Sequence, residues 1–317
     1  MTKNAIGIDL GGTYTKLALV DSKGKIKHRS RLSTTDYDSR DSLLEAIACE
    51  IRALIQKAGL TPGNIEGIGI GVPGLVDFNR GLVYGLTNVR GWKNTPLKLL
   101  LERKLKIPVL VDNDVNIMAL GECKFGAGRG ARNAVCITLG TGVGGGIIID
   151  GSLYRGATFS AGEVGHMPLK EDGLACNCGG YGCLERYVGN RHIASEMKSA
   201  IRAGRAPGVK AMVKGDLSSV TPEIVSKAAR KGDKAAIALW EKIGGRIGTT
   251  LSGIVNLLNP EMIIIGGGVA DAGEPLFRPV RRTVKRRSMR VPGRAVKILK
   301  AKLGNDAGMI GAAALFF

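Results

Sequence analysis

The sequence predicts an α/β protein made of two related lobes, each with a sheet covered by helices. Its 317 residues, 44% of them hydrophobic, are enough to bury large cores and to divide into two domains. Predicted strands and helices alternate along the chain. A strand–glycine turn–strand unit also occurs twice, because IDLGGTYTKLALVDS (8–22) aligns without a gap with ITLGTGVGGGIIIDG (137–151). One such unit in each lobe indicates two similar domains that face each other.

The first half of the chain begins with two short strands around a glycine turn. Apolar residues at helical spacing then predict a helix over 42–59, with Ser42 and Glu45 as a capping box and Gly59 as its stop. Three further elements are predicted: a buried strand at 65–74, a helix opened by Pro96, and a strand at 107–116 that ends in polar residues.

The second half restarts in the same way. Strands at 134–140 and 145–151 flank a glycine turn, and a cysteine-rich insertion follows. A long helix is predicted from Lys234 to about Asn256, and Pro260 leads into the strand EMIIIGGG (261–268).

The net charge of +19 is concentrated in residues 277–302, which contain no acidic residue. Such a segment indicates either a patch for nucleic acid, polyphosphate or another anionic surface, or a solvated helix face. We favour the solvated face and expect no nucleic-acid partner, because no aromatic residues interleave with the basic ones. The chain shows neither a leader peptide nor an apolar run long enough for a membrane, so we expect a reducing, cytoplasmic setting and no membrane partner.

Two glycine turns offer backbone N–H groups to an anion and are candidate phosphate cradles. In the first turn, Asp9 can hold a Mg²⁺-bound water, and Thr13 and Lys16 can meet phosphate oxygens. The second turn spans 138–144; its GTGVGG stretch is followed by a strand, whereas a dinucleotide fold requires a helix there. Each turn alone could be an ordinary hairpin. A buried strand ending in three glycines, IIIGGGVA (263–270), adds a surface without side chains where a base or ribose can lie.

In order, these elements resemble the ROK family of sugar kinases and sugar-responsive repressors, within the sugar kinase/actin/heat-shock ATPase superfamily. The resemblance covers nearly the whole chain and is closest to the bacterial-type glucokinases of that family. It rests on GIDLGGTYTK, GVPGLVD, NDVN, LGTGVGGGIIIDGSLYRGATFSAGEVGH, CNCGGYGCLE and NPEMIIIGGGV.

The resemblance implies two ribonuclease H-like/actin-like ATPase lobes around a central cleft, with a zinc-binding loop in the larger lobe. The smaller lobe would comprise residues 1–115 and 303–317, and the larger one residues 116–302. The implied partners are a hexose, ATP with Mg²⁺, and further copies of the chain in a dimer or tetramer. The implied ATP and Mg²⁺ contacts are Asp9, Gly11, Gly12, Thr13, Lys16, Thr138, Gly140, Thr141, Gly142, Gly144, Gly266, Gly267 and Gly268.

Asp114 is the candidate general base. It lies just past a strand end, and the family places its catalytic aspartate here in the N-D-x-N pattern. Phosphoryl transfer needs a carboxylate that accepts the proton of the sugar hydroxyl. The alternative is that Asp114 only caps a helix starting at Val115. For sugar binding the resemblance nominates Gly74, Asn88, Asn113, Asp114, Glu163, His166 and Glu185.

Three of the six cysteines lie within eight residues, in the spacing His166-x9-Cys176-x-Cys178-x4-Cys183. Cys₃His is a recognised ligand set for tetrahedral, structural Zn²⁺, and Gly179, Gly180 and Gly182 permit the tight turns it needs. A redox pair would favour C-x-x-C. The remaining cysteines, Cys49, Cys123 and Cys136, are predicted to be small core residues.

The resemblance thus implies an ATP-dependent kinase that phosphorylates the 6-hydroxyl of glucose. Alternatives are an N-acetylmannosamine, fructose or allose kinase of the same family, or a polyphosphate-using variant. The non-enzyme alternative is a sugar-sensing regulator. A repressor is not expected, because the first predicted strand begins within the first ten residues and leaves no room for a preceding helix-turn-helix domain.

Overall fold

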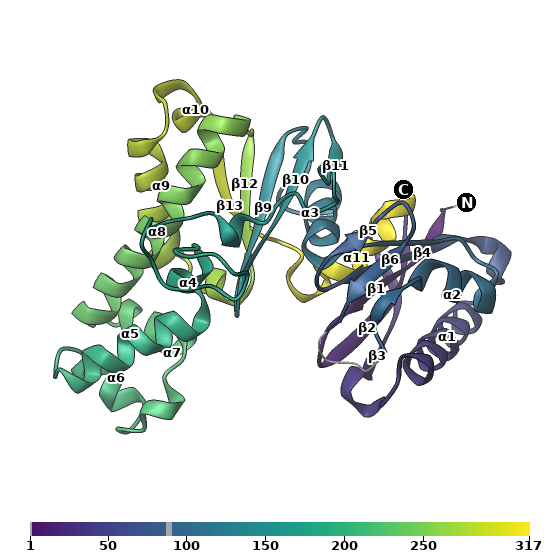
Figure 1. Cartoon of the computed structure of the whole chain (residues 1–317), viewed down its shortest axis with the longest axis horizontal. Helices are drawn as coiled ribbons and strands as arrows, with labels where there is room; N and C mark the ends of the chain where they lie inside the picture. The colour runs from purple at the N-terminus through teal and green to yellow at the C-terminus, as the bar shows by residue number, and fades with distance from the viewer. Residues whose placement is uncertain (1, 87–90) are drawn as a thin grey trace. The chain divides into compact units, whose positions relative to one another are not determined.

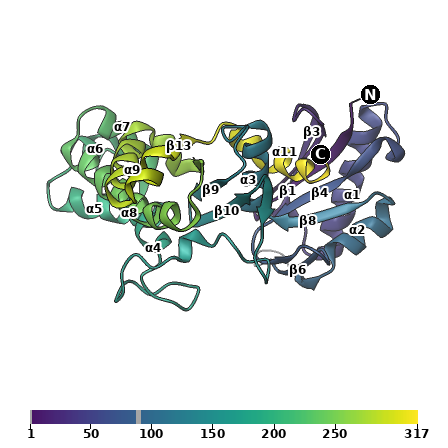
Figure 2. The ribbon, with the colours of Figure 1, turned by 90° about the horizontal axis from the view of Figure 1, so that it is seen from above.

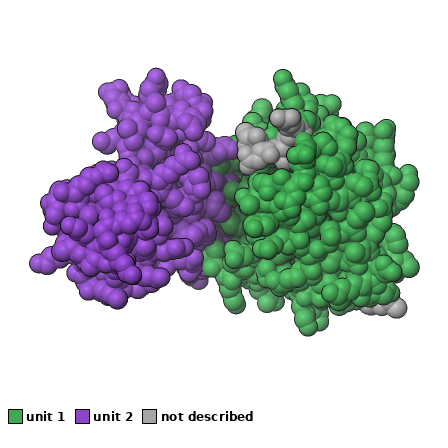
Figure 3. Space-filling model, turned by 90° about the horizontal axis from the view of Figure 1, so that it is seen from below, with its two compact units in different colours: residues 1–132, 146–162, 301–317 green, residues 133–145, 163–300 purple. Residues whose placement is uncertain are grey.

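The computed structural model describes residues 2–86 and 91–317 (Figure 1). The chain forms two compact units, coloured separately in Figure 3. Unit 1 consists of Met1–Arg132, Gly146–Gly162 and Ala301–Phe317, and unit 2 of Asn133–Gly145 and Glu163–Lys300. These units are defined by contacts, whereas the lobes predicted from the sequence follow its motifs, so the predicted lobe boundaries stay a prediction.

Unit 1 is built on a five-stranded sheet with the order β3-β2-β1-β4-β8. The first three strands form antiparallel pairs, and β4 lies parallel to both β1 and β8. The strands are β1 (Asn4–Leu10), β2 (Tyr14–Asp21), β3 (Ile26–Ser33), β4 (Ile65–Val72) and β8 (Val109–Asn113).

Alternate residues of these strands face two different helical layers. Ile6 and Ile8 belong to the apolar cluster with α1 and α2, whereas Ala5 packs with Met309 of α11. Figures 1 and 2 show the helices around this sheet. The remaining elements that lie in unit 1 are η1 (Thr34–Asp36), α1 (Arg40–Lys57), η2 (Pro62–Asn64), β5 (Val76–Asp77), β6 (Leu82–Gly85), β7 (Lys93–Thr95), α2 (Leu97–Leu105), α3 (Asp114–Phe125), β11 (Ser152–Tyr154), η6 (Gly304–Asp306), α11 (Ala307–Ala313) and η7 (Ala314–Phe316).

The start of α1 differs from the prediction. Its capping box pairs Ser39 with Ser42, rather than Ser42 with Glu45, because the helix begins one turn earlier. The predicted stop is confirmed, since Gly59 follows the C-cap with a φ of 66°. Cys49 lies on the exposed face of α1, so its assignment to the core was wrong, whereas Cys123 and Cys136 are buried.

A second five-stranded sheet repeats the same order as β11-β10-β9-β12-β13. Here β12 is parallel to β9 and β13, as β4 is to its neighbours. The additional strands are β9 (Ala134–Leu139), β10 (Val143–Ile149), β12 (Met262–Gly266) and β13 (Lys297–Lys300), and β10 contributes residues to both units. The duplicated order confirms the predicted α/β fold with two related sheets.

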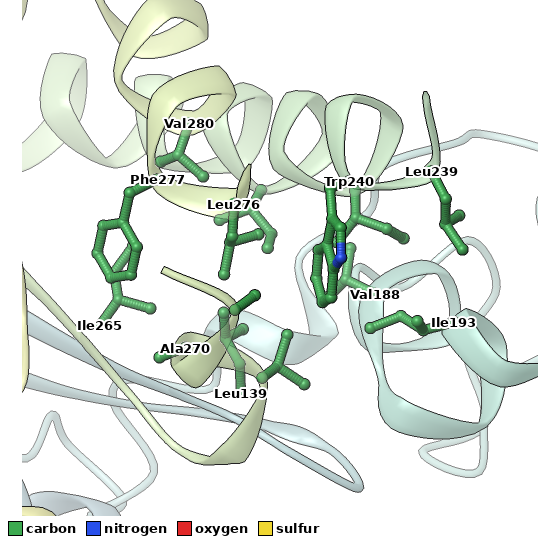
Figure 4. Packing of buried hydrophobic residues seen from close by; sticks show 14 of the residues in the cluster. Leu139, Val188, Ile193, Leu239, Trp240, Ile265, Ala270, Leu276, Phe277 and Val280 are labelled. Atoms are coloured by element: carbon green, nitrogen blue, oxygen red, sulfur yellow. The ribbon is translucent and has the colours of Figure 1, made fainter. Parts of the chain in front are cut away.

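Helices surround the core of unit 2, where Trp240 and Leu276 are fully buried and Phe277 nearly so. Figure 4 shows these side chains packing with Leu139 and Ile265 from the strands. The long predicted helix is confirmed as α8. The other elements are η3 (Val164–His166), α4 (Glu185–Val188), α5 (Asn190–Arg202), α6 (Pro207–Met212), η4 (Leu217–Ser219), α7 (Pro222–Arg230), α8 (Lys234–Leu258), η5 (Gly268–Ala272), α9 (Glu274–Arg287) and α10 (Arg290–Ala295).

The basic segment forms most of α9, with α10 and β13. Leu276, Val280 and Val284 face the core, and the charged residues of α9 are exposed. Arg281 pairs with Glu274 at 2.9 Å, Arg282 pairs with Glu241, and Lys300 pairs with Asp271 at 2.7 Å. The geometry therefore favours a solvated helix face, part of whose charge is balanced locally. Within residues 2–86 and 91–317, no helix combines the length and apolar character needed to cross a membrane.

Candidate functional site

The first glycine turn joins β1 to β2 and places Asp9 opposite Lys16. The Lys16 ammonium lies 3.5 Å from a carboxylate oxygen of Asp9. Burial raises the pKa of Asp9, and the neighbouring Lys16 opposes that shift. Gly308 at the start of α11 lies so close that a Cβ there would sit 2.7 Å from the Asp9 carboxyl carbon. The turn thus brings a confined carboxylate close to a cationic side chain, and their roles toward Mg²⁺ and phosphate stay a prediction.

Thr34 supports this turn from η1, and the sequence did not point to it. Its hydroxyl donates to the Gly11 carbonyl at 2.8 Å and lies 2.9 Å from the hydroxyl of Thr15. Its backbone N–H donates to the carbonyl of Thr13 at 2.9 Å. A single buried threonine therefore fixes both sides of the turn, and only tertiary structure brings it there.

Asp114 is the first residue of α3, directly after β8. The N-cap is Asn113, whose side-chain oxygen accepts from the N–H groups of Val115 at 2.8 Å and Asn116 at 3.2 Å. The capping role considered for Asp114 thus belongs to its neighbour. Asp114 itself accepts from the Val115 N–H at 2.9 Å and is partly exposed.

Asn113 also connects the helix start to the GVPGLVD turn. Its side-chain nitrogen donates to the carbonyl of Gly74 at 3.1 Å, and Gly74 has a φ of 89°. These bonds occupy the amide oxygen and one amide hydrogen of Asn113, and leave its second hydrogen for another acceptor. Asn88, which the sequence nominated for sugar binding, lies outside the described residues.

The second glycine turn, between β9 and β10, is held by residues from α4 and α5. The Gly140 carbonyl accepts from the Asn190 N–H at 2.9 Å, and a Glu185 oxygen accepts from the Val143 N–H at 3.3 Å. The hydrogen bond between the Gly140 N–H and the Gly142 carbonyl closes the turn at 3.0 Å. Thr138, Thr141 and Gly144 lie in the same segment. This turn is thus shaped from outside, through segments that follow it in the chain.

The three glycines at the end of β12 have different structural roles. Gly266 pairs with Thr138 in the parallel register of β12 and β9. Gly267 has a φ of 83°, and a Cβ there would lie 2.3 Å from the carbonyl oxygen of Leu139. Gly268 has open space where a side chain would be. Gly267 therefore permits the approach of the two strand ends, and the space beside Gly268 is open, while its contact with a nucleoside stays a prediction.

The predicted metal ligands come together. The ligand atoms of His166, Cys176, Cys178 and Cys183 all lie within 4.8 Å of one another. The Cys178 and Cys183 sulfurs are 3.6 Å apart, and the Cys176 sulfur is 3.6 Å from Nδ1 of His166. The cysteine spacing, together with the family resemblance that supported His166, therefore identified residues that come together.

The geometry of this cluster fits zinc. Tetrahedral Zn²⁺ with Zn–S bonds of about 2.3 Å and Zn–N bonds of about 2.0 Å separates its ligand atoms by about 3.5–3.8 Å. The separations of 3.6 Å match those edges and are far longer than a disulfide bond. Burial and the neighbouring Cys178 and Cys176 sulfurs raise the pKa of Cys183 to about 12. A bound cation would reverse that preference for the thiol.

Glu163 and Glu185 flank the cluster, and Glu163 lies beside its histidine, His166. Nδ1 of His166 faces Cys176, and its Nε2 lies 3.9 Å from a Glu163 oxygen. One carboxylate oxygen of Glu185 lies 3.6 Å from the Cys176 sulfur, and the other holds Val143. Glu185 thus links the metal cluster to the second glycine turn, a connection that the sequence did not indicate.

A pocket of about 600 Å³ in unit 2 lies beside the second turn. It is lined by Thr141, Gly142, Leu174, Asn177, Glu185, Arg186, Gly189, Arg191, His192 and Ser195. Its two arginines, Arg186 and Arg191, come from α4 and α5, so this concave surface suits an anionic ligand.

Comparisons with known proteins identify the family. A family model described as ROK family matches residues 5–317. The chain belongs to the ROK family. A glucokinase from Halalkalibacterium halodurans is 36% identical over 96% of this chain and 92% of its own length. A glucokinase from Streptomyces coelicolor is 37% identical over 98% of this chain and 96% of its own length.

Solved ROK structures share the fold. A ROK family glucokinase from Streptomyces griseus, solved in complex with glucose and AMPPNP, superimposes with a TM-score of 0.80 at 35% identity and covers 98% of both chains. A xylose repressor from Caldicellulosiruptor bescii is also similar, with 32% identity over 98% of this chain and 77% of the repressor. This chain therefore has relatives that are named as kinases and relatives that are named as repressors.

Proposed function

We propose that this ROK protein is an ATP-dependent glucokinase that transfers the γ-phosphoryl group of MgATP to the 6-hydroxyl of glucose. The observation that carries the proposal is the position of Asp114, partly exposed, at the β8–α3 junction, where the helix N-cap is Asn113 and Asp114 is the first helical residue. The Streptomyces griseus glucokinase, with its bound glucose and ATP analogue, supports the substrate pair.

Phosphoryl transfer makes few covalent demands on a protein, so positioning and electrostatics dominate. In the proposed reaction Asp114 accepts the proton of the 6-hydroxyl as that oxygen bonds to the γ-phosphorus, while the bond from the γ-phosphorus to the β–γ bridging oxygen breaks and ADP leaves. Asp9 holds a water of the Mg²⁺ ion that accompanies ATP, and Lys16 meets a phosphate oxygen. The other proposed ATP contacts are Gly11, Gly12, Thr13, Thr138, Gly140, Thr141, Gly142, Gly144, Gly266, Gly267 and Gly268.

Sugar recognition is proposed to use carboxylates, amides and an imidazole, which bind neighbouring hydroxyl groups in pairs. The proposed contacts are Gly74, Asn88, Asn113, Asp114, Glu163, His166 and Glu185. His166 can combine two roles, because Nδ1 faces the cysteines while Nε2 points toward Glu163.

The Cys₃His cluster is proposed to hold a structural Zn²⁺ ion. All four ligands come from the protein, so no coordination position remains for substrate. When bound, the ion would fix the loop that carries His166 and ends at Glu185.

A sugar-sensing regulator is the second candidate, because a xylose repressor is similar in sequence over 98% of this chain. N-acetylmannosamine, fructose, allose and polyphosphate remain alternative substrates. A cytoplasmic setting and assembly into a dimer or tetramer also remain predictions.

A substrate panel tests the proposal. Purified chain is mixed with glucose, mannose, fructose, allose, xylose or N-acetylmannosamine, each with ATP or polyphosphate, and product is measured by sugar phosphate formation. We expect glucose with ATP to give the highest kcat/KM. Sugar binding without any turnover would support the regulator instead, and a higher value for another hexose would replace glucose.

The Asp114→Asn variant tests the assigned base. It should fold and bind glucose but lose about 10³-fold in kcat, near the middle of the range for a lost general base. Asp216→Asn, which removes an exposed capping aspartate of η4, is the matched control and should keep its activity. Full activity of purified Asp114→Asn would overturn the assignment.

A further inference from the structure

We infer that Arg155 and Asp112 form a positioning pair that holds the catalytic aspartate, Asp114, in place. This inference rests on the proposed function. The ROK motifs drew attention to the N-D-x-N residues, whereas Asp112 and Arg155 had no assigned role. They lie 43 positions apart in sequence and meet beside the β8–α3 turn.

Asp112 is almost completely buried, and its carboxylate is fully used. One oxygen accepts from Nε of Arg155 at 2.8 Å and lies 2.7 Å from its Nη2. The other accepts from the backbone N–H of Asn113 at 2.8 Å and from the side-chain nitrogen of Asn116 at 2.9 Å. The carboxylate thus reaches the residue before Asp114 and the residue two positions after it.

Asn116 shows that this contact with Asp112 matters. The side chain is 2% exposed, and within residues 2–86 and 91–317 its oxygen has no hydrogen-bond partner. A buried acceptor without a partner costs free energy, so the amide is best explained by the hydrogen that it donates to Asp112. The catalytic turn is therefore clamped on both sides of Asp114.

Arg155 is positioned as carefully as the carboxylate that it binds. Its guanidinium carbon lies 3.6 Å from the centre of the Phe78 ring, and only 18% of its side chain is exposed. Its carbonyl accepts from the Ala161 N–H at 2.9 Å, which shapes the loop that leads to Glu163. A planar guanidinium can stack on a ring and donate along one edge at the same time, which a lysine cannot do.

The pair would act on rate rather than on binding. A small displacement of a reacting group lowers kcat strongly, even when the ligands still bind. Asp112 and Arg155 act through Asp114 and need not touch either substrate. Their loss should therefore lower kcat while the KM values for glucose and ATP change little.

Three variants test the inference: Arg155→Met, Asp112→Asn and the double variant with both changes. Each single variant leaves one buried charge without its partner and should lower both Tm and kcat. The double variant restores neutrality and should recover much of the lost Tm. We expect its kcat to stay about 30-fold or more below wild type, with both KM values within about threefold. Arg155→Lys, which keeps the charge but not the planar contact, should fall between wild type and Arg155→Met.

Lys124→Met is the matched control, because it also removes a partly buried cation of unit 1, at the other end of α3. Lys124 donates to the carbonyls of Ala314 at 2.9 Å and of Phe317, far along the helix from Asp114. It should lower Tm and leave kcat of the folded enzyme within about twofold.

The outcomes separate the two proposals. A wild-type chain without hexose turnover overturns the proposed function and the positioning role together. An active wild type whose double variant regains kcat along with Tm overturns the positioning role alone, since the pair would then only stabilise the fold. A large rise in KM at unchanged kcat would also overturn it, because the pair would then contribute to binding.

Discussion

The two glycine turns occupy equivalent places in two sheets of the same strand order, yet they are built differently. The first turn contains charge: Asp9 and Lys16 face each other across β1 and β2. The second turn, 138–144, has no charged residue of its own. Its carboxylate comes from Glu185, more than forty positions away, which binds the Val143 N–H.

This difference indicates how a repeated strand–glycine turn–strand unit can acquire two functions. The first turn supplies its own electrostatics, as expected for a site that holds a hydrated cation. The second depends on segments that follow it in the chain, the loop that carries the Cys₃His cluster and the junction of α4 and α5. Substitutions in the first turn should therefore affect chemistry without loss of stability, whereas those around the second should affect stability and binding together.

Among the changes that compare the two glycine turns, Asp9→Asn should produce the largest effect. The amide has nearly the same shape but no charge to hold hydrated Mg²⁺, so we expect kcat/KM for MgATP to fall about 10²- to 10³-fold, in the range for lost electrostatic stabilisation. Asp21→Asn, at the other end of β2, is the control. The Asp21 carboxylate accepts from the N–H groups of Lys23 and Lys25 and should affect Tm rather than kcat. Steady-state kinetics would contradict the comparison if Asp9→Asn kept wild-type turnover.

The ligand-free stability of Asp9→Asn should move in the opposite direction. Burial raises the pKa of Asp9, so the folded protein binds this proton more tightly than the unfolded chain. The stability contributed by Asp9 is therefore greatest below its unfolded pKa and is lost as pH rises through the raised folded value. At neutral pH the buried charge disfavours folding, and Asp9→Asn should keep or raise Tm. As pH falls, the Tm of wild type should rise relative to that of Asp9→Asn. A Tm of Asp9→Asn below that of wild type at neutral pH, with no such relative change toward acid, would contradict this prediction.

The two related sheets and the main helices were predictable because their sequence signals are local and, for the hairpins, repeated. The gap-free match between 8–22 and 137–151 identified two equivalent hairpins, and helical spacing identified α1 and α8. The predicted N-cap of α1 was wrong. The sequence offers two possible capping boxes, Ser39 with Ser42 and Ser42 with Glu45, and it does not decide at which of them the helix begins. Cys49 was misplaced for a similar reason, because one position on a helix changes the face that a residue occupies.

The candidate site was predictable where its residues are close in sequence. Cys176, Cys178 and Cys183 share one loop, and their spacing carries the chemistry. Thr34 and Arg155 could not be found this way, because each reaches its partner only through folding. A polar side chain that supports a turn from a distant segment leaves no periodic or motif signal.

Zinc removal should produce the second-largest effect and tests the dependence of the second turn on its surroundings. Chelation, or Cys178→Ser, should release about one metal ion per chain and raise KM for glucose about 10-fold or more. KM for ATP should rise as well, because Glu185 connects the cluster to Val143. Cys49→Ser is the control, since this cysteine is also exposed but lies on α1. Unchanged metal content and sugar affinity in Cys178→Ser would disprove the structural zinc site.

Glu185 offers the finest test, with an expected change of about three- to tenfold. Glu185→Ala removes the acceptor of the Val143 N–H and the proposed sugar contact, so KM should rise for both glucose and ATP. Glu185→Gln keeps an oxygen for Val143 but loses the charge, so only KM for glucose should rise. Isothermal titration with glucose and with an ATP analogue measures the two affinities separately. Equal losses of ATP affinity in both variants would mean that the charge of Glu185, rather than its hydrogen bond to Val143, supports the turn. The second turn would then resemble the first more closely than its structure indicates.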